Sequence, residues 1–89
     1  MINETITVIN KLGLHARASA KLVMLAANFN CEIKISKDGK WANAKSLMGI
    51  MMLSVRCGNI ITIEADGDDE GKALQEIEQL FNNKFGEVE

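Results

Sequence analysis

Two hydrophobic periods alternate along the chain, and each predicts a different kind of secondary structure. Apolar and polar side chains alternate in residues 4–10 and 31–36, a pattern typical of strands with one buried face. Residues 60–65 form the most β-prone run of the chain, because β-branched side chains dominate it. Residues 16–28 are rich in strong helix formers, and in residues 73–85 the apolar side chains form one stripe of a helix that would cover the sheet.

These periods also predict which side chains point inward. They are Cys31, Ile33 and Ile35 on the second strand, Leu22, Val23, Leu25 and Ala26 on the first helix, and Ala73, Leu74, Ile77, Leu80, Phe81 and Phe85 on the last helix. The acidic run 66–70 stands at the start of the last helix, where the helix dipole favours negative charge. We expect that helix to be structural and to cover the sheet.

Turn residues separate the predicted elements. Gly13 permits a tight backbone turn between the first strand and the first helix. Asp38-Gly39 is a strong hairpin signal, so a short return strand is expected to follow it, with Trp41 packing on the hairpin. Gly58-Asn59 then turns the chain into the last strand.

Residues 43–53 follow the hairpin and predict a short helix that has apolar side chains on nearly every side. Ile50 and Leu53 lie three positions apart and are expected to face the core. A surface helix of so small a domain cannot bury every side, so Leu47, Met48 and Met51 are expected to form a partly exposed, adaptable apolar patch. The alternative is that all three are ordinary core residues.

The predicted order of elements is β-α-β-β-α-β-α. A chain of 89 residues makes one domain, residues 1–89, with a single core. The simplest arrangement around one core is a four-stranded antiparallel sheet that carries its three helices on one face. The sequence therefore predicts the α/β class, of the α+β kind.

Composition narrows the classes of function. A net charge of −2 disfavours nucleic acid as the main ligand, because phosphate backbones require a basic surface. No apolar run is long enough to span a membrane and no leader is recognisable, so we expect a soluble, cytoplasmic protein. Cys31 and Cys57 are too few and too far apart for a zinc site or disulfide framework, and we expect both to be reduced, small apolar residues. No metal and no cofactor is expected.

His15, the single histidine of the chain, is predicted at or just before the first turn of the first helix. The backbone N–H groups of a first turn, here those of Ala16 and Arg17, have no partner within the helix and readily hold a phosphate. Arg17 adds a planar fork of donors for the same anion. A neutral imidazole beside such a cradle is a plausible phosphoryl acceptor. The alternative is a histidine that serves only as a cap or a solvated surface group.

The segment Gly13-Leu14-His15-Ala16-Arg17-Ala18-Ser19-Ala20 resembles the active-site signature of HPr, the histidine-containing phosphocarrier family of the bacterial sugar phosphotransferase system. The resemblance implies an open-faced sandwich of four strands and three helices. It also implies that His15 is phosphorylated on the ring nitrogen nearer the backbone and that Arg17 assists. A proline often follows the arginine in that family, whereas this chain has Ala18.

The resemblance further implies a place in a phosphate relay. Enzyme I, charged from phosphoenolpyruvate, would donate the phosphoryl group to His15, and a IIA domain of a sugar permease would receive it. The protein would thus be a covalent intermediate in transfer, not a stand-alone catalyst. Its docking surface is expected to combine one helix face (Arg17, Ala20, Lys21 and Met24) with Leu47, Met48 and Met51, and we expect a monomer.

Ser46 carries a second hypothesis. It is a natural N-cap for the short helix, and the segment 45–51 resembles the regulatory-serine region of HPr proteins that the HPr kinase/phosphorylase modifies. Phosphate there would add negative charge at the docking surface and slow transfer from enzyme I. The alternative, equally weighted, is that Ser46 is an N-cap only.

The sequence bears on four rival functions. A phosphocarrier of the nitrogen-linked phosphotransferase branch is compatible with the sequence. A regulatory binding module that acts only through Ser46 would not need His15. An RNA-binding sheet is disfavoured because the few aromatic residues form no strand motif. A hydrolase with His15 as base is disfavoured because no nucleophile with an orienting acid can be assigned.

Overall fold

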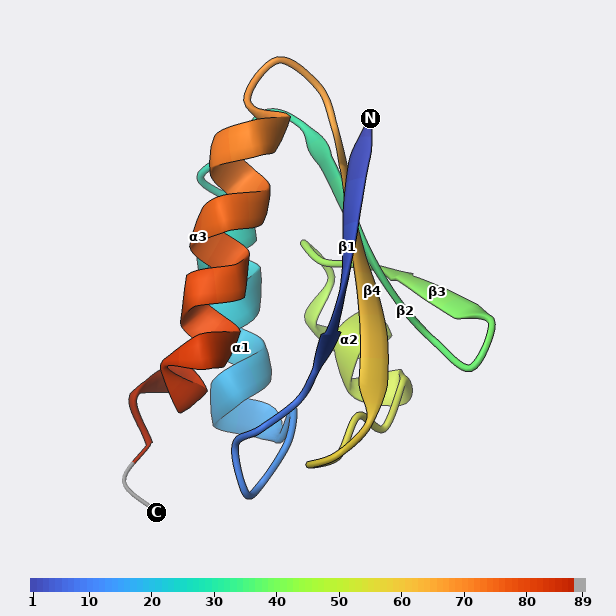
Figure 1. The fold of residues 1–89 in the computed structure, drawn as a ribbon, viewed down its shortest axis with the longest axis vertical. Helices are drawn as coiled ribbons and strands as arrows, with labels where there is room; N and C mark the ends of the chain where they lie inside the picture. The colour runs from blue at the N-terminus through green and yellow to red at the C-terminus, as the bar shows by residue number, and fades with distance from the viewer. Residues whose placement is uncertain (88–89) are drawn as a thin grey trace.

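A computed structural model describes residues 1–87 of the chain. Four strands and three helices follow one another in the predicted order, and a single 3₁₀ turn comes last (Figure 1). Their bounds are β1 (Ile2–Thr7), α1 (Ala16–Ala26), β2 (Glu32–Lys37), β3 (Lys40–Asn43), α2 (Leu47–Met52), β4 (Ile60–Asp66), α3 (Glu70–Asn82) and η1 (Lys84–Gly86).

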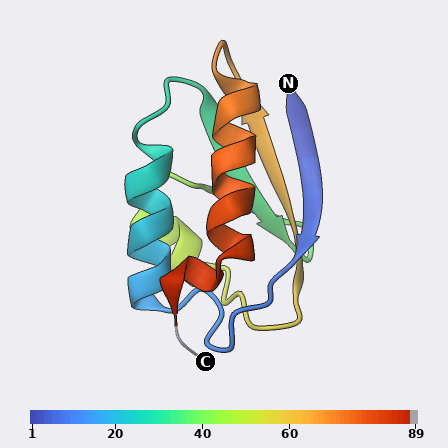
Figure 2. The same cartoon turned by 60° about the vertical axis from the view of Figure 1, so that its left-hand side comes forward.

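The strands form one antiparallel sheet in the order β1-β4-β2-β3. Ile6 is paired with Ile61 and Ile35 with Ile63, so apolar residues of neighbouring strands stand side by side. All three helices lie on one face of this sheet, and α1 and α3 run next to each other across it (Figures 1 and 2). No helix within residues 1–87 lies over the other face, so the predicted open-faced arrangement is confirmed.

The core lies between the sheet and the helices. Cys31 and every second residue of β2 and β4 point into it, as the period of two predicts, and the two long helices contribute their apolar stripes. Its fully buried large side chains include Leu22, Ile33, Ile35, Ile50, Ile61, Ile63, Ile77, Phe81 and Phe85. On the uncovered face the strands carry polar side chains, such as Thr5 and Thr62, whose hydroxyls are 3.3 Å apart.

Several boundaries differ from the prediction. β1 ends at Thr7, because the next residue no longer belongs to the strand pairing with β4. The Val8 N–H donates instead to the carbonyl oxygen of Asn59, in the turn before β4. Phe85 belongs to the buried stripe but lies beyond α3, in the 3₁₀ turn.

Trp41 was expected to pack on the hairpin. It lies on edge strand β3, and 51% of its surface is exposed.

The short helix α2 confirms the prediction of a partly exposed apolar patch. Ile50 and Leu53 are buried, whereas the predicted patch residues are 42% to 73% exposed: Leu47, Met48 and Met51. Met52, 75% exposed, extends that patch, although the sequence analysis did not include it. The alternative, in which all the patch residues belong to the core, is wrong.

The two cysteines are free but occupy different surroundings. Cys31 is buried, and desolvation raises the pKa of its thiol to about 11, so the thiol is inert. Cys57 is exposed in the turn before β4. Within residues 1–87 no helix is both long and apolar enough to cross a bilayer, and no cluster of three metal-ligating side chains occurs.

Gly13 generates a testable prediction about stability. Its φ is +62°, and a Cβ built there would lie 2.5 Å from the Val55 carbonyl oxygen. Gly58, with φ +90°, has no atom within 4 Å of the same position. We predict that Gly13→Ala lowers the free energy of unfolding by about 3 kcal/mol, and Gly58→Ala by about 1 kcal/mol, because only the first adds a steric clash to the left-handed cost.

Urea denaturation of both variants beside the parent protein measures the difference. Equal losses in the two variants would contradict the steric explanation.

Candidate functional site

His15 stands at the start of α1, as the sequence predicted. It is the N-cap residue, with an extended backbone (φ −73°, ψ −179°), and its carbonyl oxygen accepts a hydrogen bond from the Ser19 N–H at 2.8 Å. Its side chain does not cap the helix and is 28% exposed. The imidazole is therefore held at the surface and is available for chemistry.

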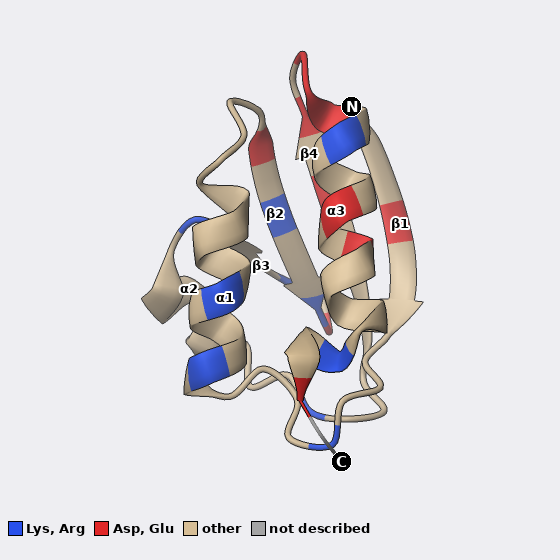
Figure 3. Ribbon diagram, turned by 90° about the vertical axis from the view of Figure 1, so that its left-hand side faces the viewer, with Lys and Arg blue, Asp and Glu red and all other residues tan. Residues whose placement is uncertain are grey.

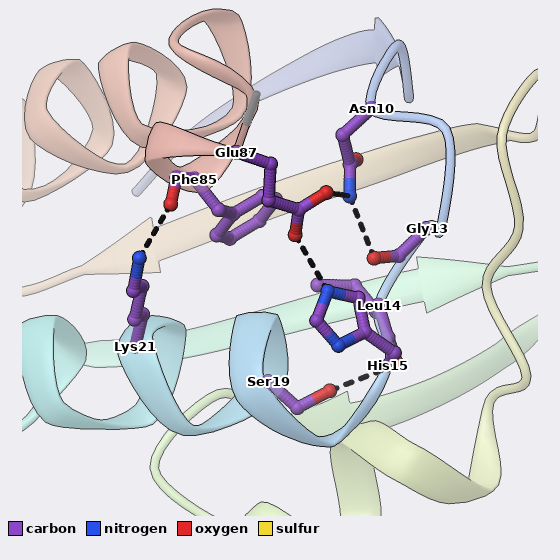
Figure 4. Close-up of polar contacts among 8 residues, drawn as sticks. All are labelled: Asn10, Gly13, Leu14, His15, Ser19, Lys21, Phe85 and Glu87. Carbon is purple, nitrogen blue, oxygen red and sulfur yellow. Dashed lines mark hydrogen bonds and ion pairs between the residues drawn. The ribbon is translucent and has the colours of Figure 1, made fainter. Parts of the chain in front are cut away.

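The turn before the histidine is fixed from several sides (Figure 4). The buried amide of Asn10 donates to the Gly13 carbonyl oxygen at 2.7 Å. The Leu14 N–H donates to the Val55 carbonyl oxygen at 3.0 Å, and the hydroxyl of Ser19 donates to the Leu14 carbonyl oxygen at 3.0 Å. These contacts fix the backbone before His15 and thereby the position of its ring.

One ring nitrogen of His15 forms a hydrogen bond with an acidic residue near the C-terminal end of the chain. The His15 Nε2 lies 2.5 Å from Oε2 of Glu87, whose Oε1 is 3.4 Å from the Asn10 amide nitrogen. Figure 4 shows the carboxylate reaching down from the C-terminal segment to the imidazole. Among residues 1–87 the hydrogen bonding of this ring involves Nε2, which leaves Nδ1, the nitrogen nearer the backbone, open.

The hydrogen bond from His15 lowers the pKa of the Glu87 carboxyl, an effect that desolvation opposes and that Asn10 and Lys21 reinforce. Because the folded-state pKa lies below the ordinary value of 4.5, the contact stabilises the fold at higher pH and is lost as the pH falls through the lowered pKa. Glu87 was not predicted from the sequence, since nothing in the local pattern connects it with position 15.

Basic side chains surround the ring. A cavity of about 510 Å³ is lined by Lys11, Leu12, His15, Arg17, Lys21, Gly86 and Glu87. Figure 3 shows two basic stretches on α1, whose basic residues are Arg17 and Lys21. Lys21 also donates to the Phe85 carbonyl oxygen at 2.6 Å. Among the described residues, three basic side chains and one carboxylate line the pocket, a composition that favours an anionic ligand.

The first turn of α1 supplies further donors. The helix begins at Ala16, has no acidic side chain in its first turn and receives no side-chain cap. The N–H groups of Ala16 and Arg17 precede the first hydrogen bond within the helix, the one from Ser19 to His15. The first-turn N–H groups of α1 are therefore not capped by a side chain, and their role as an anion site stays a prediction.

The expected docking residues lie on two neighbouring helices. Helices α1 and α2 pack against each other, and Met24 of α1 is 71% exposed. Lys21 is exposed as well, whereas Ala20 is half buried. Ser46 begins α2, and its hydroxyl accepts a hydrogen bond from the Gly49 N–H at 3.1 Å, so its predicted N-cap role is confirmed.

Comparisons with known proteins agree with this geometry. A family model described as "PTS HPr component phosphorylation site" matches residues 2–83. The chain is 51% identical to the phosphocarrier protein HPr of Cupriavidus necator, with all of both chains covered. It is 43% identical to the phosphocarrier protein NPr of Shewanella violacea, with 98% of this chain and 96% of the relative covered.

A crystal structure of HPr from Thermoanaerobacter tengcongensis has the same fold. It superposes with a TM-score of 0.96 at 46% identity and covers all of both chains.

Proposed function

The chain belongs to the HPr family of phosphocarriers of the phosphotransferase system, and we propose that it accepts a phosphoryl group from phospho-enzyme I on His15 and passes it to IIA domains of sugar permeases. The observation that carries this proposal is the partly exposed His15 ring at the start of α1, inside a pocket lined by Arg17 and Lys21. The proposed place of action is the cytoplasm, and the proposed form is a monomer.

The chemistry requires positioning and charge stabilisation more than covalent machinery. A lone pair of the imidazole forms the N–P bond while the bond between phosphorus and the donor breaks. Arg17 offsets the charge of the phosphoryl oxygens, and the N–H groups of Ala16 and Arg17 offer them hydrogen bonds. This cradle is moderate in strength, which suits a carrier that must release its cargo.

Partner docking is proposed for the surface formed by α1 and α2. Four of its apolar side chains are 42% to 73% exposed: Met24, Leu47, Met48 and Met51. Unbranched methionine side chains repack easily, which suits a surface that must fit several partners in turn. Arg17, Lys21 and the half-buried Ala20 adjoin this patch on α1, and the two cations would complement an acidic rim on enzyme I and on IIA domains.

A second candidate is service in the nitrogen-linked branch of the phosphotransferase system. The similarity to the NPr protein of Shewanella violacea favours it, because that relative matches nearly the whole chain. Both candidates use the same chemistry at His15 and differ only in their partners.

Regulation through Ser46 is a further part of the proposal. Its hydroxyl is partly buried and bonded to the Gly49 N–H, and it begins the helix that carries Leu47 and Met48. A phosphate at this position would add nearly two negative charges beside the patch. Transfer from enzyme I would then slow through repulsion and desolvation without unfolding of the domain.

We predict that incubation with phosphoenolpyruvate and enzyme I produces an acid-labile, alkali-stable phosphate on the parent chain and none on His15→Ala. Arg17→Ala is expected to slow transfer by about 100-fold, since one charge-stabilising donor is lost. The measurement is phosphate incorporation against time, with enzyme I of the sugar branch and of the nitrogen branch in parallel. Phosphate on His15→Ala would refute the assignment of the acceptor.

Met48→Asp is predicted to weaken transfer from enzyme I by about 10-fold while the fold stays intact, because a charge would have to be desolvated at the docking patch. Gln75→Asp, on the exposed side of α3, adds the same charge away from the patch and is the matched control. Steady-state transfer kinetics and urea denaturation measure the two effects. Unchanged kinetics in Met48→Asp would remove this patch from the docking surface.

Incubation with ATP and an HPr kinase/phosphorylase is predicted to place an acid-stable phosphate on Ser46, and Ser46→Ala is predicted to remain unmodified. Ser46→Ala also loses the N-cap, at a cost of about 1 kcal/mol in unfolding free energy. Mass spectrometry locates the phosphate. If the cognate kinase leaves Ser46 unmodified, the residue is an N-cap only.

A further inference from the structure

Resting on the proposed function of His15, we infer that Glu87 is a positioning residue, whose carboxylate keeps the proton of the His15 imidazole on Nε2 and thereby directs the incoming phosphoryl group to Nδ1.

The contact itself determines the tautomer. An ionised carboxylate only accepts hydrogen bonds, so the 2.5 Å contact between Glu87 Oε2 and His15 Nε2 requires the hydrogen to be on that nitrogen. A neutral imidazole carries one ring hydrogen, and Nδ1 then keeps its lone pair. The carboxylate also covers Nε2 and so denies it to a phosphoryl donor.

The carboxylate is itself held in place. Its side chain is only 13% exposed, and Oε1 accepts from the Asn10 amide at 3.4 Å. The same amide nitrogen donates to the Gly13 carbonyl oxygen at 2.7 Å, so one buried asparagine fixes both the turn before the histidine and the group that orients its ring. Outer partners of this kind commonly set the tautomer and orientation of a functional histidine.

The backbone of the C-terminal segment directs Glu87 into the pocket. Lys84 and Phe85 both have positive φ values, 56° and 57°, which non-glycine residues rarely adopt. The strained turn is maintained because the Phe85 ring is buried against Phe81, with centroids 4.8 Å apart, and because Lys21 holds the Phe85 carbonyl oxygen. Backbone strain that is stabilised in this way often lies at a functional site.

The transfer step balances with this assignment. The Nδ1 lone pair forms the N–P bond, the donor–phosphorus bond breaks, and its electron pair leaves with the donor. The proton stays on Nε2, so the ring becomes an imidazolium whose charge faces the Glu87 carboxylate. Onward transfer reverses these changes and returns a neutral ring with the same tautomer.

Phosphoramidate, a small phosphoryl donor that needs no partner protein, tests the inference. ¹⁵N NMR of the imidazole assigns the tautomer before reaction, and ³¹P NMR distinguishes Nδ1- from Nε2-phosphohistidine afterwards. The comparison uses the parent chain, Glu87→Leu, Glu87→Gln and Glu76→Leu. Glu76→Leu replaces a carboxylate of α3 that pairs only with Lys72 among the described residues, so it is the matched control.

The parent and Glu76→Leu are expected to have the hydrogen on Nε2 and to form the Nδ1 product. Glu87→Leu is expected to mix the tautomers, to yield both products and to react at Nδ1 more slowly by about 10-fold. Glu87→Gln is expected to restore the tautomer, because its amide oxygen accepts from Nε2.

A hydrogen on Nδ1 in the parent, or the parental tautomer and product in Glu87→Leu, would overturn the inference. The parent tautomer is measured without any variant, so a folding defect in Glu87→Leu does not prevent this decision. Reaction with phosphoramidate at Nδ1 but not with enzyme I of either branch would instead refute the proposed function and leave the role of Glu87 intact.

Discussion

The hydrogen bond from the Leu14 N–H to the Val55 carbonyl oxygen, 3.0 Å long, joins the turn before the histidine to the segment between α2 and β4. It requires close backbone approach, which Gly13 permits because a Cβ would meet the same carbonyl oxygen at 2.5 Å. The start of α1 is thus fixed to the main body of the fold. The orientation of His15 depends on this junction.

The molecule separates stability from chemistry. Its core is built from one face of the sheet and the apolar stripes of the helices, whereas the His15 ring and the Glu87 carboxylate lie where the chain turns into α1 and leaves α3 (Figures 1 and 4). Helix α2 contributes to both regions, because Ile50 is buried in the core and Met48, a residue of the proposed docking patch, is exposed.

Much of this arrangement was readable from the sequence, because hydrophobic period and turn chemistry are local signals. They predicted the order of elements, the N-cap at Ser46 and the position of His15 at a helix start. Glu87 was not predicted because its partner, His15, is 72 positions away in the sequence. The turn that brings it there also depends on positive φ values at Lys84 and Phe85, which the sequence pattern does not indicate. Met52 was not predicted because the spacing of Ile50 and Leu53 identifies the buried side of α2 but does not show how far the exposed apolar patch extends.

The two ends of the described chain lie at opposite ends of the long axis (Figure 1). The amino group of Met1 meets Glu70 at 3.1 Å, near the start of α3, whereas Glu87 touches the reactive ring. A fluorophore attached at position 87 would therefore lie against the His15 ring and replace the carboxylate that contacts it. The same label at Met1 would disturb the two ion pairs of the amino group, with Asp66 and Glu70, which are of small energetic weight.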